Sequence, residues 1–152
     1  MVQSKQTTIN PYLTFPGNCR EAMEFYKTCL NGELEIMPFE GSPVDVPDDY
    51  KQKVLHSTLM FGDAVLMASD NQPGQKVEFG NAIFISIAAS DLEEAENIFN
   101  ALSSGGRVIM PFDDTFWGSK FGMFTDKFGV GWMVSHEVEQ EQGDYYKAPD
   151  DF

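Results

Sequence analysis

The sequence is poor in cysteine, histidine and basic residues, and it has no long apolar run. Its 152 residues include only 2 Cys, 2 His and 10 Lys or Arg, against 24 acidic side chains. The formal charge of −14 repels nucleic-acid phosphates and anionic membrane surfaces, so neither is an expected partner. No apolar stretch approaches the roughly 18 residues that a membrane-spanning helix needs.

The two cysteines, Cys19 and Cys29, are expected to be free thiols. Both fall within one predicted helix, where ten residues at about 1.5 Å rise put them about 15 Å apart, beyond disulfide reach. The first ten residues lack the apolar segment of a secretory signal peptide. Free thiols without a signal peptide predict a cytoplasmic protein.

What the chain does have is a repeat at an offset of 73 residues. The tetrapeptide Ile-Met-Pro-Phe occurs at 36–39 and again at 109–112, and Glu-Ala occurs at 21–22 and again at 94–95. Such matches predict two copies of one structural unit. The predicted division is a first module over 1–70, a linker over 71–79, a second module over 80–137 and an acidic C-terminal tail over 138–152.

Each copy is predicted to fold as βαβββ. The helix of the first copy has a capping-box-like start at Asn18 with Glu21, and Asn31-Gly32 ends it. The helix of the second copy begins at Ser90 or Asp91, each with a glutamate three residues later. Alternating or β-branched runs predict strands at 9–15, 33–39, 54–61 and 64–69, and at 82–88, 107–111, 120–125 and 130–136.

This order of elements resembles the vicinal oxygen chelate superfamily, which includes glyoxalase, bleomycin-resistance and extradiol dioxygenase proteins. The resemblance is to its PhnB-like branch, the demethylubiquinone methyltransferase-type domain. It covers the chain from Ile9 to His136. The signatures are Pro11-Tyr12-Leu13-x-Phe15, Glu21-Ala22-x-x-Phe25-Tyr26, Gly62-x-x-x-Leu66-Met67-x-Ser69-Asp70, and Trp117-Gly118-x-x-x-Gly122-x-x-x-Asp126-x-Phe128-Gly129-x-x-Trp132.

The resemblance implies an α+β fold in which two βαβββ modules form curled mixed sheets around a shared cleft, with the helices outside. It also implies a homodimer. In metal-using relatives, ligands lie on the first and last strands of each unit. Those positions are expected to fall here on Pro11, Met67, Phe84 and Met133, none of which suits a hard divalent ion. The sequence therefore predicts no metal ligands and no cofactor.

Apolar residues at these positions predict a concave pocket for a small molecule. Each candidate could instead fill the core, and Trp132 in particular could pack against the hairpin at Phe128-Gly129. The predicted ligand-binding residues are Tyr12, His56, Met67, Phe84, Ser86, Trp117, Trp132 and Met133.

Three functions remain open at this point, and the sequence does not decide whether the chain is an enzyme. The first is metal-free binding of a small apolar or aromatic molecule. The second is a metal-dependent lyase, isomerase or dioxygenase-type enzyme of the same superfamily. The third is a dimeric interaction module with a filled cleft. No glycine-rich turn precedes a helix, as binding of a nucleotide-type cofactor would require.

Overall fold

The structure is a computed structural model that describes residues 6–137, so the predicted acidic tail lies outside the described residues. The chain divides into two units, with the boundary between Ile83 and Phe84. No helix within the described part is long and apolar enough to cross a membrane.

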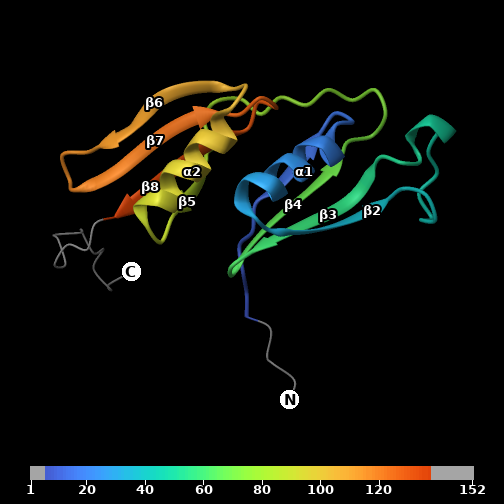
Figure 1. Ribbon diagram of the computed structural model, residues 1–152. Coiled ribbons are helices and arrows are strands. Elements are labelled where there is room, and N and C mark those ends of the chain that lie inside the picture. Colours follow the sequence, from blue (N-terminus) through green and yellow to red (C-terminus); the bar gives the residue numbers. More distant parts are fainter. Residues whose placement is uncertain (1–5, 138–152) are drawn as a thin grey trace, which may run out of the picture. The chain divides into compact units, whose positions relative to one another are not determined.

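Both units have the predicted βαβββ order, and the α+β fold class is confirmed (Figure 1). The two sheets have the same strand order, β1-β4-β3-β2 and β5-β8-β7-β6. In each, the first strand runs parallel to the last and the other neighbours are antiparallel. The elements are β1 (Tyr12–Phe15), α1 (Cys19–Leu30), β2 (Glu33–Pro38), the 3-10 helix η1 (Asp48–Tyr50), β3 (Val54–Phe61), β4 (Ala64–Asp70), β5 (Ile85–Ala88), α2 (Leu92–Ser103), β6 (Arg107–Asp114), β7 (Ser119–Thr125) and β8 (Gly131–Glu137).

One helix packs on one face of each sheet, and the core of each unit lies between them (Figure 1). Helix α1 buries Met23 and Tyr26, and helix α2 buries Phe99 and Leu102. These residues recur at helical spacing, so they form one apolar stripe per helix. Full burial of each such side chain stabilises the fold by about 1.5–3 kcal/mol.

The two helices begin in different ways. Asp91 accepts a hydrogen bond from the Glu94 amide at 2.7 Å, which confirms the predicted N-cap of α2. Asn18 is the residue before α1, as predicted, but the expected side-chain cap is wrong, because Asn18 makes no cap hydrogen bond. Instead, Asp70 at the end of β4 accepts from the Cys19 amide at 2.9 Å, 51 residues away along the chain.

The segment expected to be a linker packs on the first unit. The ring of Phe79 meets that of Phe15 edge-on at 5.5 Å, and the Tyr50 hydroxyl donates to the Asn71 carbonyl. The following strand, β5, begins at Ile85, three residues later than expected, since residues 82–84 do not pair with β8.

The repeated Ile-Met-Pro-Phe tetrapeptide lies in the edge strands β2 and β6. The pairing register shifts between Met37 and Pro38 in β2, and on both sides of Met110 in β6. The phenylalanine that follows each proline packs on an aromatic ring, Phe39 on Tyr50 and Phe112 on Phe99, with centroids 5.6 and 5.5 Å apart. A bulge and a proline, which lacks an N–H, also make these edges poor partners for a further strand.

Candidate ligand-binding face

The face of each sheet that its helix leaves uncovered is called here the helix-free face. The Ser57 hydroxyl contacts the Cys19 sulfur of α1 at 3.7 Å, so its strand neighbours His56 and Thr58 point to the other side. In the second unit, Phe124 packs edge-on against Phe99 of α2 at 5.2 Å, which puts Met123 on the helix-free face.

On the helix-free face of the first unit, the pairing register aligns Tyr12, Met67 and Thr58 across β1, β4 and β3. The Tyr12 hydroxyl makes a 2.9 Å hydrogen bond to Nδ1 of His56, and the two rings stack with centroids 5.7 Å apart. The other ring nitrogen of His56 lies 3.2 Å from the Thr58 hydroxyl. Because β4 separates β1 from β3, the Tyr12 ring must cross β4 to reach His56.

On the helix-free face of the second unit, the corresponding row is Ser86, Met133, Met123 and Met110. Ser86 pairs with Met133 as Tyr12 pairs with Met67, so a small side chain stands where the first unit has a phenol. A serine cannot reach across β8 as Tyr12 reaches across β4. The three methionines therefore lie side by side without a ring from β5 above them.

The register shows which first-strand residues lie opposite the two methionines expected at ligand positions. Tyr12 and Ser86, not Pro11 and Phe84, lie opposite Met67 and Met133. Pro11 precedes β1, and Phe84 lies just before β5 and takes no part in its pairing with β8. Counting back from each helix does not find both residues, because Tyr12 lies seven residues before the start of α1 and Ser86 lies six before the start of α2.

Neither pair of residues suits the hard divalent ion that the fold family implies. A phenol or hydroxyl beside a thioether is a poor ligand set for nickel, zinc or manganese. Throughout residues 6–137, no three His, Cys, Asp or Glu side chains come together as a ligand group.

The structure places Trp132 on the helix side of its sheet. It is fully buried, and its indole N–H donates to Asp126 at 2.8 Å. The same carboxylate accepts from the amides of Phe128 and Val130, so it holds the β7–β8 turn together. This placement agrees with the hairpin-packing alternative and separates Trp132 from the candidates on the helix-free face.

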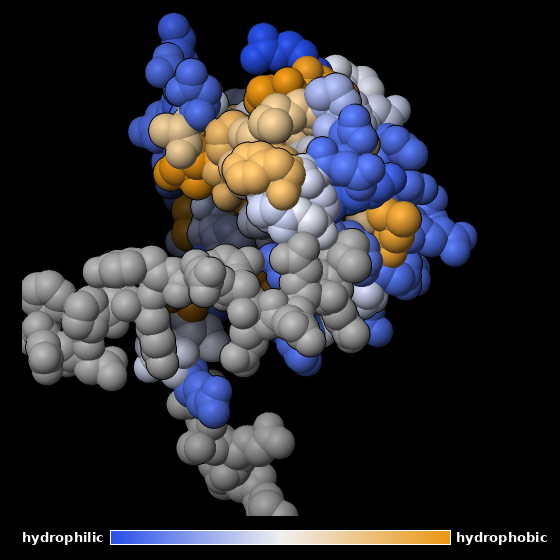
Figure 2. All heavy atoms as spheres, turned by 90° about the vertical axis from the view of Figure 1, so that its left-hand side faces the viewer, coloured by the Kyte–Doolittle hydropathy of each residue, from blue (hydrophilic) through white to orange (hydrophobic). Residues whose placement is uncertain are grey.

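Trp117 lies in the loop between β6 and β7, beside an exposed aromatic neighbour. The ring of Phe116 is 97% exposed and meets that of Trp117 edge-on at 4.9 Å. The ring of Trp117 also lies 6.4 Å from that of Phe121, which pairs with Ser135 on the helix-free face. Figure 2 shows apolar side chains gathered on the side of the molecule that carries the β6–β7 loop.

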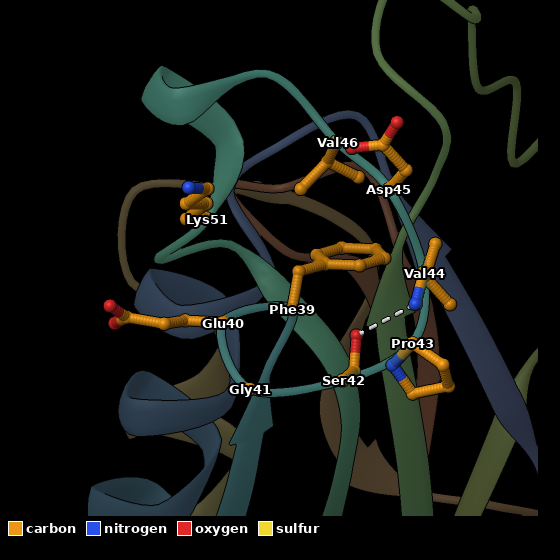
Figure 3. A pocket seen from close by; sticks show the side chains of 9 residues that line it. All are labelled: Phe39, Glu40, Gly41, Ser42, Pro43, Val44, Asp45, Val46 and Lys51. Carbon is orange, nitrogen blue, oxygen red and sulfur yellow. Dashed lines mark hydrogen bonds between the residues drawn. The ribbon is translucent and has the colours of Figure 1, made fainter.

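A hollow of about 300 Å³ lies under the loop that follows β2 (Figure 3). Figure 3 marks a hydrogen bond between two of the lining residues, from the Val44 amide to the Ser42 hydroxyl at 3.3 Å. Glu40 points away from the ring of Phe39 (Figure 3), and Lys51 pairs with Asp48 at 2.8 Å. Since its charged groups do not converge, this hollow is a weaker candidate than the helix-free faces.

The buried thiol of Cys19 is not a candidate nucleophile. Burial raises the pKa of Cys19 to about 12, and the nearby Asp70 carboxylate also raises it, while the Ser57 hydrogen bond lowers it. The thiol is therefore neutral near pH 7, whereas a nucleophilic cysteine needs the thiolate.

Comparison with known proteins decides the family. The sequence model described as 3-demethylubiquinone-9 3-methyltransferase matches residues 7–135. The chain belongs to this PhnB-like family. Protein YjdN of Escherichia coli is 29% identical over 143 residues, which cover 87% of this chain and 97% of YjdN.

Solved structures agree with this membership. Protein PA1353 from Pseudomonas aeruginosa is 49% identical with a TM-score of 0.78, covering 87% of this chain and 98% of that one. A PhnB protein from Bacillus cereus, titled a putative 3-demethylubiquinone-9 3-methyltransferase, is 25% identical with a TM-score of 0.72, covering 86% and 99%. A glyoxalase, bleomycin-resistance or dioxygenase protein from Nocardioides is 16% identical with a TM-score of 0.58 and covers 96% of this chain and 93% of its own. The predicted glyoxalase-type fold is thus confirmed.

Proposed function

We propose that this PhnB-family chain binds a small apolar or aromatic molecule, without a metal, on the helix-free face of its second unit. The observation that carries the proposal is Ser86 at the position of Tyr12. In the first unit the phenol lies across the sheet and bonds to His56. In the second unit the same position leaves the methionines open to a ligand.

The side chains on that face suit such a ligand. Met123 and Met133 are half-buried and flexible, so they can fit irregular apolar shapes. Phe121 and Trp117 supply flat aromatic surfaces at one side. Ser86 supplies a hydroxyl that can orient a polar substituent. The shared cleft that the family resemblance implies stays a prediction.

The name of the family does not extend the proposal to methyl transfer. A nucleotide-type methyl donor typically binds at a glycine-rich turn between a strand and a helix. The Gly105-Gly106 pair instead follows α2, and a side chain at Gly106 would clash with the Thr125 carbonyl at 2.1 Å. Gly106 therefore serves close packing of the chain after the helix, and Gly105 serves the turn, with a φ of 77°.

Fluorescence titration with Nile red, a neutral planar dye, tests the proposal. We expect saturable binding to the full chain and its loss in Ser86→Tyr, because the added ring would cover the methionines. Asn100→Tyr adds the same ring to the exposed side of α2 and should leave binding unchanged. Binding that does not saturate, or that survives Ser86→Tyr, would contradict the proposed site.

The metal-free part has its own test, because the superfamily also contains metal-dependent lyases, isomerases and dioxygenases. Titration with nickel, zinc and manganese by calorimetry should give no stoichiometric binding. A site with micromolar affinity for any of the three would overturn this part and favour the enzyme alternative.

A further inference from the structure

We propose that the thioethers of Met110, Met123 and Met133 form a site for one soft monovalent metal ion, copper(I) or silver(I). These three residues are called the thioether row. The inference concerns sulfur chemistry and goes beyond the apolar binding proposed above. Its failure would leave that proposal standing.

The pairing register brings the three side chains together. Met133 of β8 lies opposite Met123 of β7, and Met123 lies opposite Met110 of β6, all on the helix-free face. Residues directly opposite on neighbouring strands have Cβ atoms about 4.5–5.5 Å apart. Each methionine has three rotatable bonds, so the sulfurs of its neighbours can converge on one ion.

The backbone of β6 is shaped around Met110. The register shifts both between Val108 and Met110 and between Met110 and Asp113. A bulge redirects side chains and is frequent beside functional sites. The two shifts let Met110 pair with Met123 on the helix-free face although Phe112, two residues later, packs on Phe99 of α2, and Met110 remains 44% exposed.

The chemistry of the donors selects the ion. Thioethers are soft ligands, which prefer copper(I) to magnesium, manganese or zinc. The formal charge of −14 favours the approach of any cation. The acidic Asp113 lies in the next row, opposite Phe121, and so adds negative charge near the site without joining the sulfurs.

The first unit supplies an internal comparison. Met67 holds the position of Met133, but its neighbours across the sheet are Tyr12 and Thr58, which carry no sulfur. A lone thioether is a weak ligand. If binding of the ion requires several thioethers together, Met67 should not bind it.

Silver(I) is the test ion because it is soft and does not change oxidation state in air. The full chain would carry ¹³C-labelled methionine methyl groups and Cys29→Ala, which removes the more accessible thiol. We expect the methyl signals of Met110, Met123 and Met133 to shift together and to saturate at one silver per chain. The signal of Met23, which shares α1 with Cys19, would report silver at the remaining thiol.

Two matched substitutions separate sulfur from hydrophobicity. Met123→Leu keeps an apolar side chain, so it should abolish the joint shift while Nile red still binds. Met67→Leu should leave the silver titration unchanged. If Met123→Leu does not fold, Met110→Leu at the exposed end of the row replaces it.

The proposal is overturned if the three signals do not move, if they move separately without saturating, or if Met67 responds equally. If the parent chain binds Nile red but shows no silver response, only the proposed thioether row is refuted. Loss of Nile red binding with silver binding intact would refute only the apolar site.

Discussion

The two units share a strand order but place their polar groups differently. In the first, the buried Asp70 carboxylate joins the start of α1 to the start of β3, accepting from Cys19 at 2.9 Å and from Val54 at 2.8 Å. In the second, α2 is capped locally by Asp91, and the buried Asp126 closes a turn. The same strand order therefore accommodates two different ways of satisfying amides at the start of a helix.

The helix-free faces of the two units also carry different side chains. The first carries the hydrogen-bonded set Tyr12, His56 and Thr58, and the second carries a row of methionines. Tyr12 reaches across its sheet to His56, whereas Ser86 at the corresponding position of the second unit is too short to do so. A repeat can thus keep its strand order and still carry different side chains on the helix-free faces of its copies.

The largest expected effect is on the long-range cap. Asp70→Ala leaves two buried amides without an acceptor, and hydrogen bonds to charged groups contribute about 1.5–3 kcal/mol each. We expect urea unfolding to show a loss of about 3 kcal/mol or more. Asp63→Ala, at an exposed turn, is the control. If Asp70→Ala lowers the free energy of unfolding no more than Asp63→Ala does, the long-range hydrogen bonds of Asp70 do not stabilise the first unit as proposed.

The next effect is alkaline destabilisation through Cys19. Its pKa in the folded chain is about 12, above the ordinary value of 9.0, so the thiol favours folding below pH 9. That contribution is lost as the pH rises from about 9 towards 12, because the unfolded chain ionises first. Thermal unfolding at pH 7 and pH 10 should show a steeper fall for the parent chain than for Cys19→Ala. Parallel curves would contradict it.

A smaller effect is expected at the local cap of α2. Asp91→Ala removes the acceptor for the Glu94 amide and should cost about 1 kcal/mol. Asn18→Ala, at the equivalent position of α1, should be close to neutral, because the buried Oδ1 of Asn18 accepts no hydrogen bond from any described residue. Equal losses in chemical denaturation would show that the two helix starts are alike after all.

The smallest effect is expected from Tyr12→Phe, which keeps the ring but removes its bond to His56. Tyr12 is 47% exposed, so water replaces much of what is lost, and the cost should be at most about 0.5–1 kcal/mol. Tyr12→Ser should go further and let Nile red bind to the first unit as well. Unchanged dye stoichiometry in Tyr12→Ser would show that the phenol is not what covers this face.

The sequence was sufficient where the signals are local. Strand β3 has its predicted bounds, Val54 to Phe61, because its alternating pattern ends at the Gly62-Asp63 turn. Asn31 adopts the left-handed conformation expected at the end of α1, with φ of 54°.

The errors lie where distant residues compete with local ones. Asn18 has a good capping sequence, but its side chain makes no cap hydrogen bond, and Asp70 brought by β4 accepts from the first amide of α1. The positions of Tyr12 and Ser86 depend on the register of parallel strands more than 45 residues apart, which spacing from the helix does not fix. Whether the candidate residues bind a ligand stays a prediction.

The origin of the α1 cap has a consequence for synthesis of the chain. At about 5–20 residues per second, the ribosome needs roughly 3–10 seconds to add the 51 residues between Cys19 and Asp70. Helices form in about a microsecond or less, so α1 must wait millions of times its own folding time for its acceptor. Helix α2 carries Asp91 ahead of it and emerges already capped. The half of the protein that is made first is therefore the half whose helix is completed late.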